Sequence, residues 1–206
     1  MFDILWICLT YCIGSVPFGL VFAKTFCRID PRTAGSGNVG ATNVARLCGK
    51  AWGAATLACD LLKGTIPVFI AMQYSTSELV WTLTALAAIL GHLYSCFLGF
   101  KGGKGVLVAG GAILAIQPVL LPFLAIIFLV CLIPTGMVSL GSVAMAALYP
   151  VLTIIYGSLQ GYAAGDMLVC AIGSGFMSGM VIYMHRANIQ RIREGKEYRF
   201  GSRHKQ

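Results

Sequence analysis

Long apolar segments are the feature that most restricts how this chain can fold. Seven of them follow one another along the sequence: 4–23, 52–73, 79–97, 106–116, 119–134, 143–156 and 167–184. A helix needs about 20 apolar residues to span a bilayer, and irregular or shorter pieces are tolerated where protein surrounds them. The pattern predicts an all-α membrane protein, a bundle of about seven transmembrane helices of which some are short or half-spanning.

Composition supports a chain that is surrounded by lipid. Charged residues make up 11 % of the 206 residues and apolar residues 58 %, whereas soluble domains carry about 25 % charged residues. So few charges cannot cover a soluble domain, and this composition also excludes a disordered chain and a coiled coil. The eight cysteines include no CxxC pair, so we expect no metal site and interpret them as small apolar residues.

The basic residues are segregated along the chain. Of the 15 Lys and Arg residues, 14 lie in segments 24–50 and 101–105 or in the tail from His185; the exception is Lys63, inside the second apolar segment. The N-terminus and the polar segments 74–78, 117–118 and 157–166 contain none. The positive-inside rule then predicts an outside N-terminus and a cytoplasmic C-terminus. The rule also accounts for the formal charge of +8, so we expect no nucleic-acid partner.

The two ends of the chain lead to further expectations. No basic residue precedes the first apolar segment, which favours a retained helix over a signal peptide. We expect residues 1–206 to form a single integral-membrane domain, in which 185–206 are a basic cytoplasmic tail. The part of that tail from Arg193 to Lys205 is interpreted as solvated or in contact with lipid headgroups.

A first glycine-rich cluster, GSGNVGATNVAR, occupies residues 35–46. Successive glycines let backbone N–H groups point into one concavity that suits an anion, and Arg46 could grip a phosphate with two hydrogen bonds. The cluster also matches GxGxxG, but no apolar strand precedes it, so a dinucleotide fold is not favoured. The alternative is a flexible loop without a ligand.

A second glycine-rich cluster, GFKGGKG, occupies residues 99–105. It fails the Walker A pattern, because Leu98 stands where the first glycine is required and Gly105 stands where Ser or Thr is required. Two lysines among glycines still form a candidate phosphate site. The alternative is an ordinary basic loop on the inner side.

Four further polar features lie in or near the predicted inner halves of the apolar segments. Asp60 and Lys63 share a helix face at membrane depth, where charges are usually functional unless they neutralise each other. His92 is interpreted as a structural histidine, and the serines of 139–142 as helix N-caps. His185, Asn188 and Arg191 recur at a spacing that places them on one helix face. These clusters suggest a ligand with a phosphate head and an acyl tail.

The motifs together resemble a known family. GSGNVGATNVAR (35–46), DLLKG (60–64), GHLYSCFLGFKGGKGV (91–106), SLGS (139–142) and HRANIQRIREGKE (185–197) are similar to those of the bacterial membrane acyl-phosphate:glycerol-3-phosphate acyltransferases, the PlsY-like family. The resemblance implies seven transmembrane helices in the bacterial inner membrane, with the active site on the cytoplasmic side. It implies transfer of an acyl group from acyl phosphate to the sn-1 hydroxyl of glycerol 3-phosphate, which gives lysophosphatidate and inorganic phosphate.

The resemblance also implies site residues. The expected catalytic residues are His185, Asn188, Ser142 and Lys104, and the expected substrate-binding residues are Ser36, Gly37, Asn38, Thr42, Asn43, Arg46, Lys101, Gly102 and Gly103. An acyl phosphate is already activated, so we expect neither metal nor cofactor. Either His185 or the leaving phosphate could take the hydroxyl proton. The simplest assembly is a monomer in membrane lipid.

A carrier for a small phosphate-bearing anion is the alternative function. It would use the same basic and glycine-rich clusters, but it should also show polar residues across the outer halves of the spans. Those halves are almost wholly apolar here, which favours an enzyme open to one side of the membrane.

Overall fold

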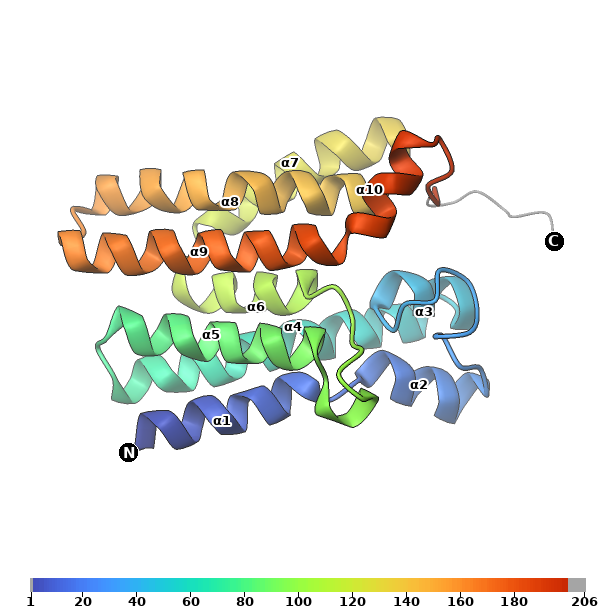
Figure 1. The fold of residues 1–206 in the computed structure, drawn as a ribbon, viewed down its shortest axis with the longest axis horizontal. Coiled ribbons are helices and arrows are strands. Elements are labelled where there is room, and N and C mark those ends of the chain that lie inside the picture. The colour runs from blue at the N-terminus through green and yellow to red at the C-terminus, as the bar shows by residue number, and fades with distance from the viewer. Residues whose placement is uncertain (1, 200–206) are drawn as a thin grey trace. The chain divides into compact units, whose positions relative to one another are not determined.

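The computed structural model describes residues 2–199, and all regular structure among them is helical. The chain divides into two compact units, Met1–Pro118 (unit 1) and Val119–Gln206 (unit 2), which are described separately (Figure 1). Among the described residues, five helical segments are long and apolar enough to cross a membrane, and two shorter apolar helices accompany them. The prediction of an all-α membrane protein with about seven apolar helices, some of them short, is confirmed.

The first apolar segment of unit 1 is broken. Instead of one helix over 4–23, the structure has α1 (Phe2–Ser15) and α2 (Phe18–Cys27), joined at Val16 and Pro17. Proline has no N–H and its ring clashes with the preceding turn, so it interrupts the helical ladder. Two carbonyl groups released at the break are satisfied by side chains: Ser95 Oγ donates to Ser15 O at 2.6 Å, and Lys63 Nζ donates to Val16 O at 2.8 Å.

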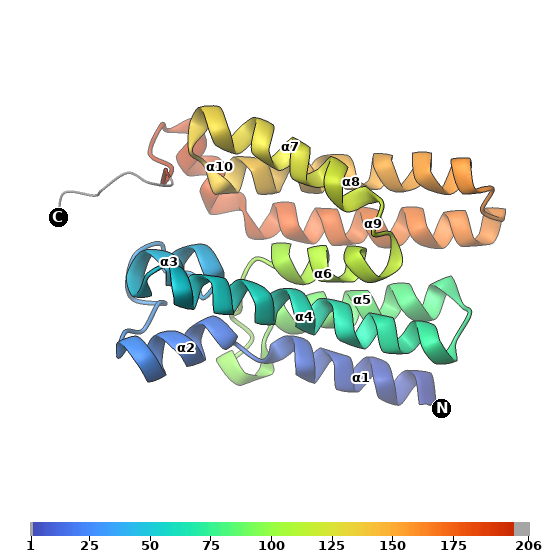
Figure 2. The same cartoon turned by 180° about the vertical axis from the view of Figure 1, so that it is seen from behind.

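Helix α4 (Lys50–Tyr74) is the centre of unit 1 (Figure 2). It packs against α1, α2 and the short helix α3 (Ala41–Cys48), and also against α5 (Glu78–Leu93) and α6 (Val106–Ile116). A 3₁₀ turn, η1 (Cys96–Leu98), follows α5. Within unit 1, the basic segment 28–40 lies at the end away from the chain's N-terminus, and segment 94–105 follows the end of α5 that points in the same direction (Figure 1). The connection between α4 and α5, predicted on the outer side, and segment 94–105, predicted on the inner side, therefore lie at opposite ends of α5 (Figure 1).

Glycines let α4 and α6 touch backbone to backbone. A Cβ at Gly64 would overlap the carbonyl of Val108, and a Cβ at Gly111 would overlap the carbonyl of Leu61. Small residues permit this close approach between membrane helices, where dispersion contacts supply much of the attraction. A Cβ at Gly110, the residue before Gly111, would make only an ordinary contact of 3.8 Å with Leu61 Cδ1.

Unit 2 is built around α8 (Val138–Gln160), which packs between α7 (Leu120–Thr135) and α9 (Ala164–Met184). The amphipathic helix α10 (Arg186–Arg193) follows α9 and contacts α8 and α9 (Figure 1). Helix α8 begins earlier than the apolar segment 143–156 suggested. Its N-cap position is Met137, so Ser139 and Ser142 lie inside the first turns, and their interpretation as N-caps is wrong.

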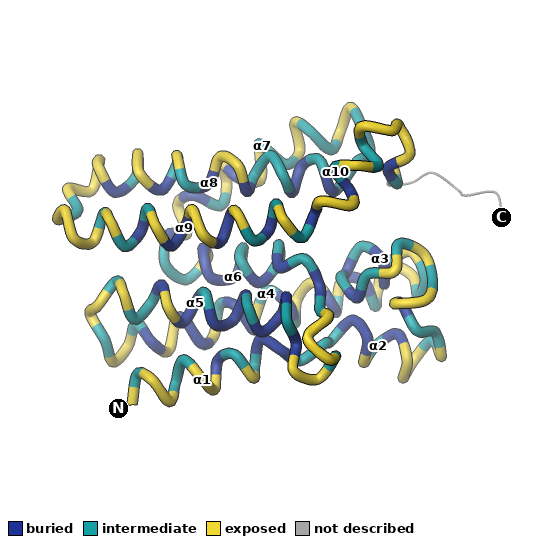
Figure 3. Tube along the Cα trace, viewed as in Figure 1, coloured by how far each residue is buried: buried dark blue, intermediate teal, exposed yellow. Residues whose placement is uncertain are grey.

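Burial follows the helix faces that meet within each unit, as the dark residues in Figure 3 show. The opposite faces carry large exposed apolar side chains, among them Ile126, Val130 and Ile133 of α7 and Leu168 and Ile172 of α9. Contiguous exposed apolar surface of this kind is typical of helices in contact with lipid. All eight cysteines are free thiols.

We predict that Gly111→Ala destabilises the protein and that Gly110→Ala does not. The methyl group at position 111 would force α4 and α6 apart, and overpacking of this kind lowers the free energy of unfolding by about 1–3 kcal/mol. Thermal unfolding in detergent measures both variants. Equal unfolding midpoints for the two variants would contradict the close backbone contact.

Candidate functional site

The amide of Asn43 organises the first glycine-rich loop. Its Nδ2 lies 3.0 Å from Pro31 O, 3.1 Å from Ala34 O and 2.8 Å from Asn38 O, and its Oδ1 accepts from Ser36 N at 2.9 Å. The residue is 2 % exposed. One side chain of α3 therefore gathers carbonyls along segment 31–38 and fixes the shape of the loop. Asn43 was expected to bind substrate, and its position favours an indirect contribution.

The other expected residues of this cluster surround Asn43. Asn38 Oδ1 accepts from Gly40 N at 2.8 Å and closes the turn into α3. Arg46, one turn further along α3, is exposed, and its Nη1 donates to Asn43 Oδ1 at 3.3 Å. Ser36 and Thr42 are partly exposed. The structure thus brings the first cluster together around one buried amide.

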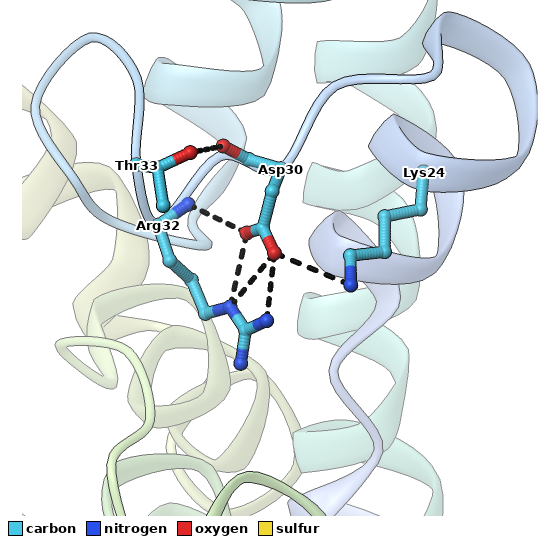
Figure 4. A network of polar contacts seen from close by, with 4 residues as sticks. All are labelled: Lys24, Asp30, Arg32 and Thr33. Carbon is cyan, nitrogen blue, oxygen red and sulfur yellow. Dashed lines mark hydrogen bonds and ion pairs between the residues drawn. The ribbon is translucent and has the colours of Figure 1, made fainter.

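An ion-pair network holds the start of the same loop (Figure 4). Asp30 Oδ2 lies 2.6 Å from Arg32 Nη2 and 3.2 Å from Lys24 Nζ at the end of α2. Thr33 Oγ1 donates to Asp30 O at 3.1 Å. Hydrogen bonds from Arg32 hold the pKa of the Asp30 carboxyl well below its usual range. The network therefore stays ionised throughout the neutral range and links α2 to the loop.

The second glycine-rich loop is attached to the end of α5. Gly102 N donates to Leu93 O at 2.9 Å, and Gly103 N donates to His92 O at 3.0 Å. Phe100 adopts a positive φ of 61°, which non-glycine residues rarely do. Lys101 is exposed and Lys104 is half-buried. Two anchored glycines thus separate the two lysines that were expected to bind phosphate.

Asp60 and Lys63 form an ion pair deep in unit 1. Lys63 Nζ lies 2.9 Å from Asp60 Oδ1, and the two side chains are 2 % and 3 % exposed. His92 Nδ1 lies 3.9 Å from the same carboxylate oxygen. Because each charge lies beside its counterion, the alternative in which Asp60 and Lys63 neutralise each other fits the structure.

Unit 2 holds the remaining expected residues. His185 lies between α9 and α10, and its Nδ1 is 2.8 Å from Val181 O. A carbonyl can only accept, so Nδ1 carries the hydrogen and Nε2 is the nitrogen that can take a proton. Asn188 and Ser142 are buried, and Ser142 Oγ donates to Val138 O within α8 at 2.9 Å.

Sequence reasoning missed Glu197, whose side chain is 3 % exposed. Its Oε1 accepts from Asn188 Nδ2 at 2.6 Å and from Ser139 Oγ at 2.8 Å. Its Oε2 accepts from Arg191 Nε at 2.8 Å. The tail from Arg193 is interpreted from the sequence as solvated or in contact with lipid headgroups. At Glu197 that interpretation is wrong, because the side chain is buried against α8 and α10. The tail from 200 to 206 lies outside the described residues.

Known proteins resemble this chain over nearly its whole length. A family model described as glycerol-3-phosphate acyltransferase matches residues 4–195. The glycerol-3-phosphate acyltransferase of Lawsonia intracellularis is 45 % identical over 195 residues, which cover 95 % of this chain and 94 % of that protein.

This chain belongs to the glycerol-3-phosphate acyltransferase family.

Solved structures agree with that membership. A crystal structure of PlsY (YgiH), an integral membrane glycerol 3-phosphate acyltransferase, in its glycerol 3-phosphate form matches with a TM-score of 0.87 and 37 % identity. The match covers 98 % of this chain and 96 % of that one. The lysophosphatidic acid form matches with a TM-score of 0.84 and 36 % identity. The predicted family is confirmed, and the chain is an integral membrane protein; the orientation of its termini stays a prediction.

The family match spans every expected site residue from Ser36 to Asn188, whereas Glu197 lies just beyond its end. One signal in the sequence could have indicated Glu197. It is an acidic residue after a glycine turn in a strongly basic tail, and such a residue has several cations within reach. The sequence alone does not say which of them it meets.

We predict that Asn43→Asp opens the first glycine-rich loop of this acyltransferase, whereas Asn38→Asp does not. Aspartate at position 43 has no N–H to donate to the three carbonyls around it, and each unsatisfied buried carbonyl costs about 1–3 kcal/mol. Aspartate at position 38 still accepts from Gly40. Hydrogen exchange of the Gly37 amide should be at least tenfold faster in Asn43→Asp, and unchanged in Asn38→Asp. A tenfold change corresponds to a loss of about 1.4 kcal/mol in the stability of the closed loop. Similar exchange in both variants would disprove this role.

We also predict that Lys63→Met is far more destabilising than the double variant Asp60→Asn, Lys63→Met. Removing one partner of a buried ion pair leaves an uncompensated charge and costs about 3–5 kcal/mol, whereas removing both charges can be nearly neutral. Unfolding of both variants in detergent tests this difference. A double variant that is as unstable as Lys63→Met would show that the ion pair itself is not the reason.

Proposed function

We propose that this protein transfers a fatty acyl group from acyl phosphate to the sn-1 hydroxyl of glycerol 3-phosphate and releases lysophosphatidate and inorganic phosphate. The observation that carries the proposal is that unit 1 holds two anchored glycine-rich clusters that carry lysine and arginine, one organised by Asn43 and one attached to the end of α5. Both substrates carry phosphate and one carries a lipid chain. Membership in the glycerol-3-phosphate acyltransferase family supports the acceptor substrate.

The loops of unit 1 would bind the phosphate groups. Exposed Arg46 offers a planar fork for two phosphate oxygens, and Lys101 and Lys104 add positive charge beside the N–H groups around Gly102 and Gly103. Ser36 and Thr42 can donate hydroxyl hydrogen bonds, and Gly37 and Asn38 belong to the turn that Asn43 holds in shape. These residues would bind the substrates by hydrogen bonding and charge neutralisation, with neither metal nor cofactor.

The chemical step would attack an already activated carbonyl. The glycerol hydroxyl oxygen forms a bond to the acyl carbon, the bond from that carbon to the phosphate oxygen breaks, and the hydroxyl proton is removed. His185 Nε2 or the leaving phosphate takes that proton. Lys104, Ser142 and Asn188 would stabilise the oxyanion and the departing phosphate.

The surroundings of the reaction follow from the same proposal. We place the active site on the cytoplasmic side of the bacterial inner membrane, because the basic segments that carry the site residues obey the positive-inside rule. Residues 1–206 would act as one domain and as a monomer. Membrane lipid would then receive the acylated product directly.

Turnover by the purified protein tests the proposal. With glycerol 3-phosphate and palmitoyl phosphate, we expect equal amounts of lysophosphatidate and inorganic phosphate, and no lysophosphatidate with palmitoyl-CoA. Lys104→Ala should lower kcat/KM by at least about 100-fold, the usual effect of losing one group that stabilises developing charge. Lys50→Ala, which changes an exposed lysine at the start of α4, is the matched control.

Two outcomes would redirect the proposal. Turnover with palmitoyl-CoA would contradict the proposal that acyl phosphate is the donor, but it would still show an acyltransferase activity. If the folded protein shows no turnover with either donor, the proposal that it is an acyltransferase is contradicted. Uptake of glycerol 3-phosphate into proteoliposomes would then support the alternative function as a carrier.

A further inference from the structure

Three buried ionisable side chains of unit 1 lie outside the expected site, yet next to one of its loops. Asp60 and Lys63 are on α4, and His92 is near the end of α5. All three residues are less than 10 % exposed. Ionisable groups at membrane depth are costly and are retained mostly where they act. The cluster therefore calls for a role beyond the packing of α4 against α5.

The imidazole of His92 lies between the ion pair and the second glycine-rich loop. On one edge, His92 Nδ1 lies 3.9 Å from Asp60 Oδ1. That oxygen forms an ion pair with Lys63 but has no hydrogen bond of good geometry among the described residues. On the other edge, Nε2 lies so close to Gly103 that a Cβ there would overlap it. The ring is thus a spacer with a charged pair behind it and the loop in front of it.

The backbone of His92 holds the same part of the loop. His92 O accepts from Gly103 N at 3.0 Å, and Leu93 O accepts from Gly102 N at 2.9 Å. Lys101 and Lys104 immediately flank these two glycines. Any movement of the ring would push on Gly103 and shift the points at which both lysines leave the loop.

We propose that His92, held in place by the Asp60–Lys63 pair, is a positioning residue that sets where the second glycine-rich loop presents Lys101 and Lys104. The inference rests on the proposed function, because it assigns those lysines to a phosphate-bearing substrate. A displacement of about 1 Å in a substrate-positioning group can lower a rate about 100-fold. A packed ring supported by a buried ion pair resists such a displacement.

The first experiment compares His92→Ala with Thr84→Val. Thr84 is a fully buried residue of the same helix, and its hydroxyl donates only to Val80 O of its own helix turn. We expect His92→Ala to lower kcat/KM for glycerol 3-phosphate or for palmitoyl phosphate by about 10- to 100-fold per folded molecule. Thr84→Val should keep the kcat/KM of the parent protein. Equal kcat/KM in the two variants would overturn the proposal.

A double variant that removes the ring at position 92 and adds a methyl group at position 103 distinguishes a positioning role of His92 from a general effect on stability. Gly103→Ala should lower kcat/KM because its methyl group presses on the His92 ring. In the double variant His92→Ala, Gly103→Ala, the methyl group enters the space that the ring vacates, so kcat/KM should exceed that of Gly103→Ala alone. Losses that simply add would overturn the proposal, since residues that do not act through one contact are additive.

Hydrogen exchange makes the inference independent of turnover. The amides of Gly102 and Gly103 should exchange about tenfold faster in His92→Ala, which corresponds to a loss of about 1.4 kcal/mol, and at the parent rate in Thr84→Val. Unchanged exchange in His92→Ala would overturn the positioning role even if the enzyme is active. If the parent protein shows no turnover, the proposed function fails, whereas faster exchange at these amides still supports the role of His92 in holding the loop. If His92→Ala does not fold, His92→Gln takes its place in the same comparison.

Discussion

The break between α1 and α2 is the constraint on which unit 1 depends. A backbone carbonyl left without a partner at membrane depth costs several kcal/mol, because no water is present to satisfy it. Pro17 creates such carbonyls, and Lys63 of α4 and Ser95 of the α5–η1 connection satisfy two of them. These two contacts fasten the break both to the central helix and to the segment that leads into the second glycine-rich loop. A helix interruption thus becomes the joint that fixes where that loop begins.

Buried polar groups need hydrogen-bond partners in the glycine-rich motifs as well, and this need divides each motif into two kinds of residue. Asn43 faces inward and satisfies carbonyls of its own loop, whereas Arg46 three residues later is exposed. In the second motif, Gly102 and Gly103 are anchored to α5, and the lysines on either side extend from that anchor. The residues that shape the loops are therefore distinct from those that can reach a ligand, although the sequence intermingles them.

Much of this fold could be predicted from apolar length and charge alone. The bounds of α6 agree with the predicted segment, because a glycine loop and a Gln-Pro turn delimit it sharply. The break at Pro17 could not be predicted from the proline alone, since prolines at 67, 134 and 150 lie inside continuous helices. What decides the outcome at Pro17 is tertiary structure: a lysine and a serine from distant segments donate hydrogen bonds to the freed carbonyls.

The site was harder to predict where a contact joins residues far apart in the sequence. The resemblance indicated Asn188, but nothing local to it indicates that its amide donates to Glu197, nine residues on. Likewise the spacing of Asp60 and Lys63 predicts a pair on one helix face, but not that His92 of another helix stands beside it. Local periodicity indicates which residues lie on the same face of one helix. The residue that contacts them from another helix is determined by packing.

The carboxylates show how this packing treats charge. Asp30 holds Lys24 and Arg32, Asp60 holds Lys63, Glu194 holds Lys196 and Glu197 holds Arg191. Each of these basic partners lies outside the residues assigned to substrate. These four carboxylates therefore engage cations that hold loops, turns and helices in place.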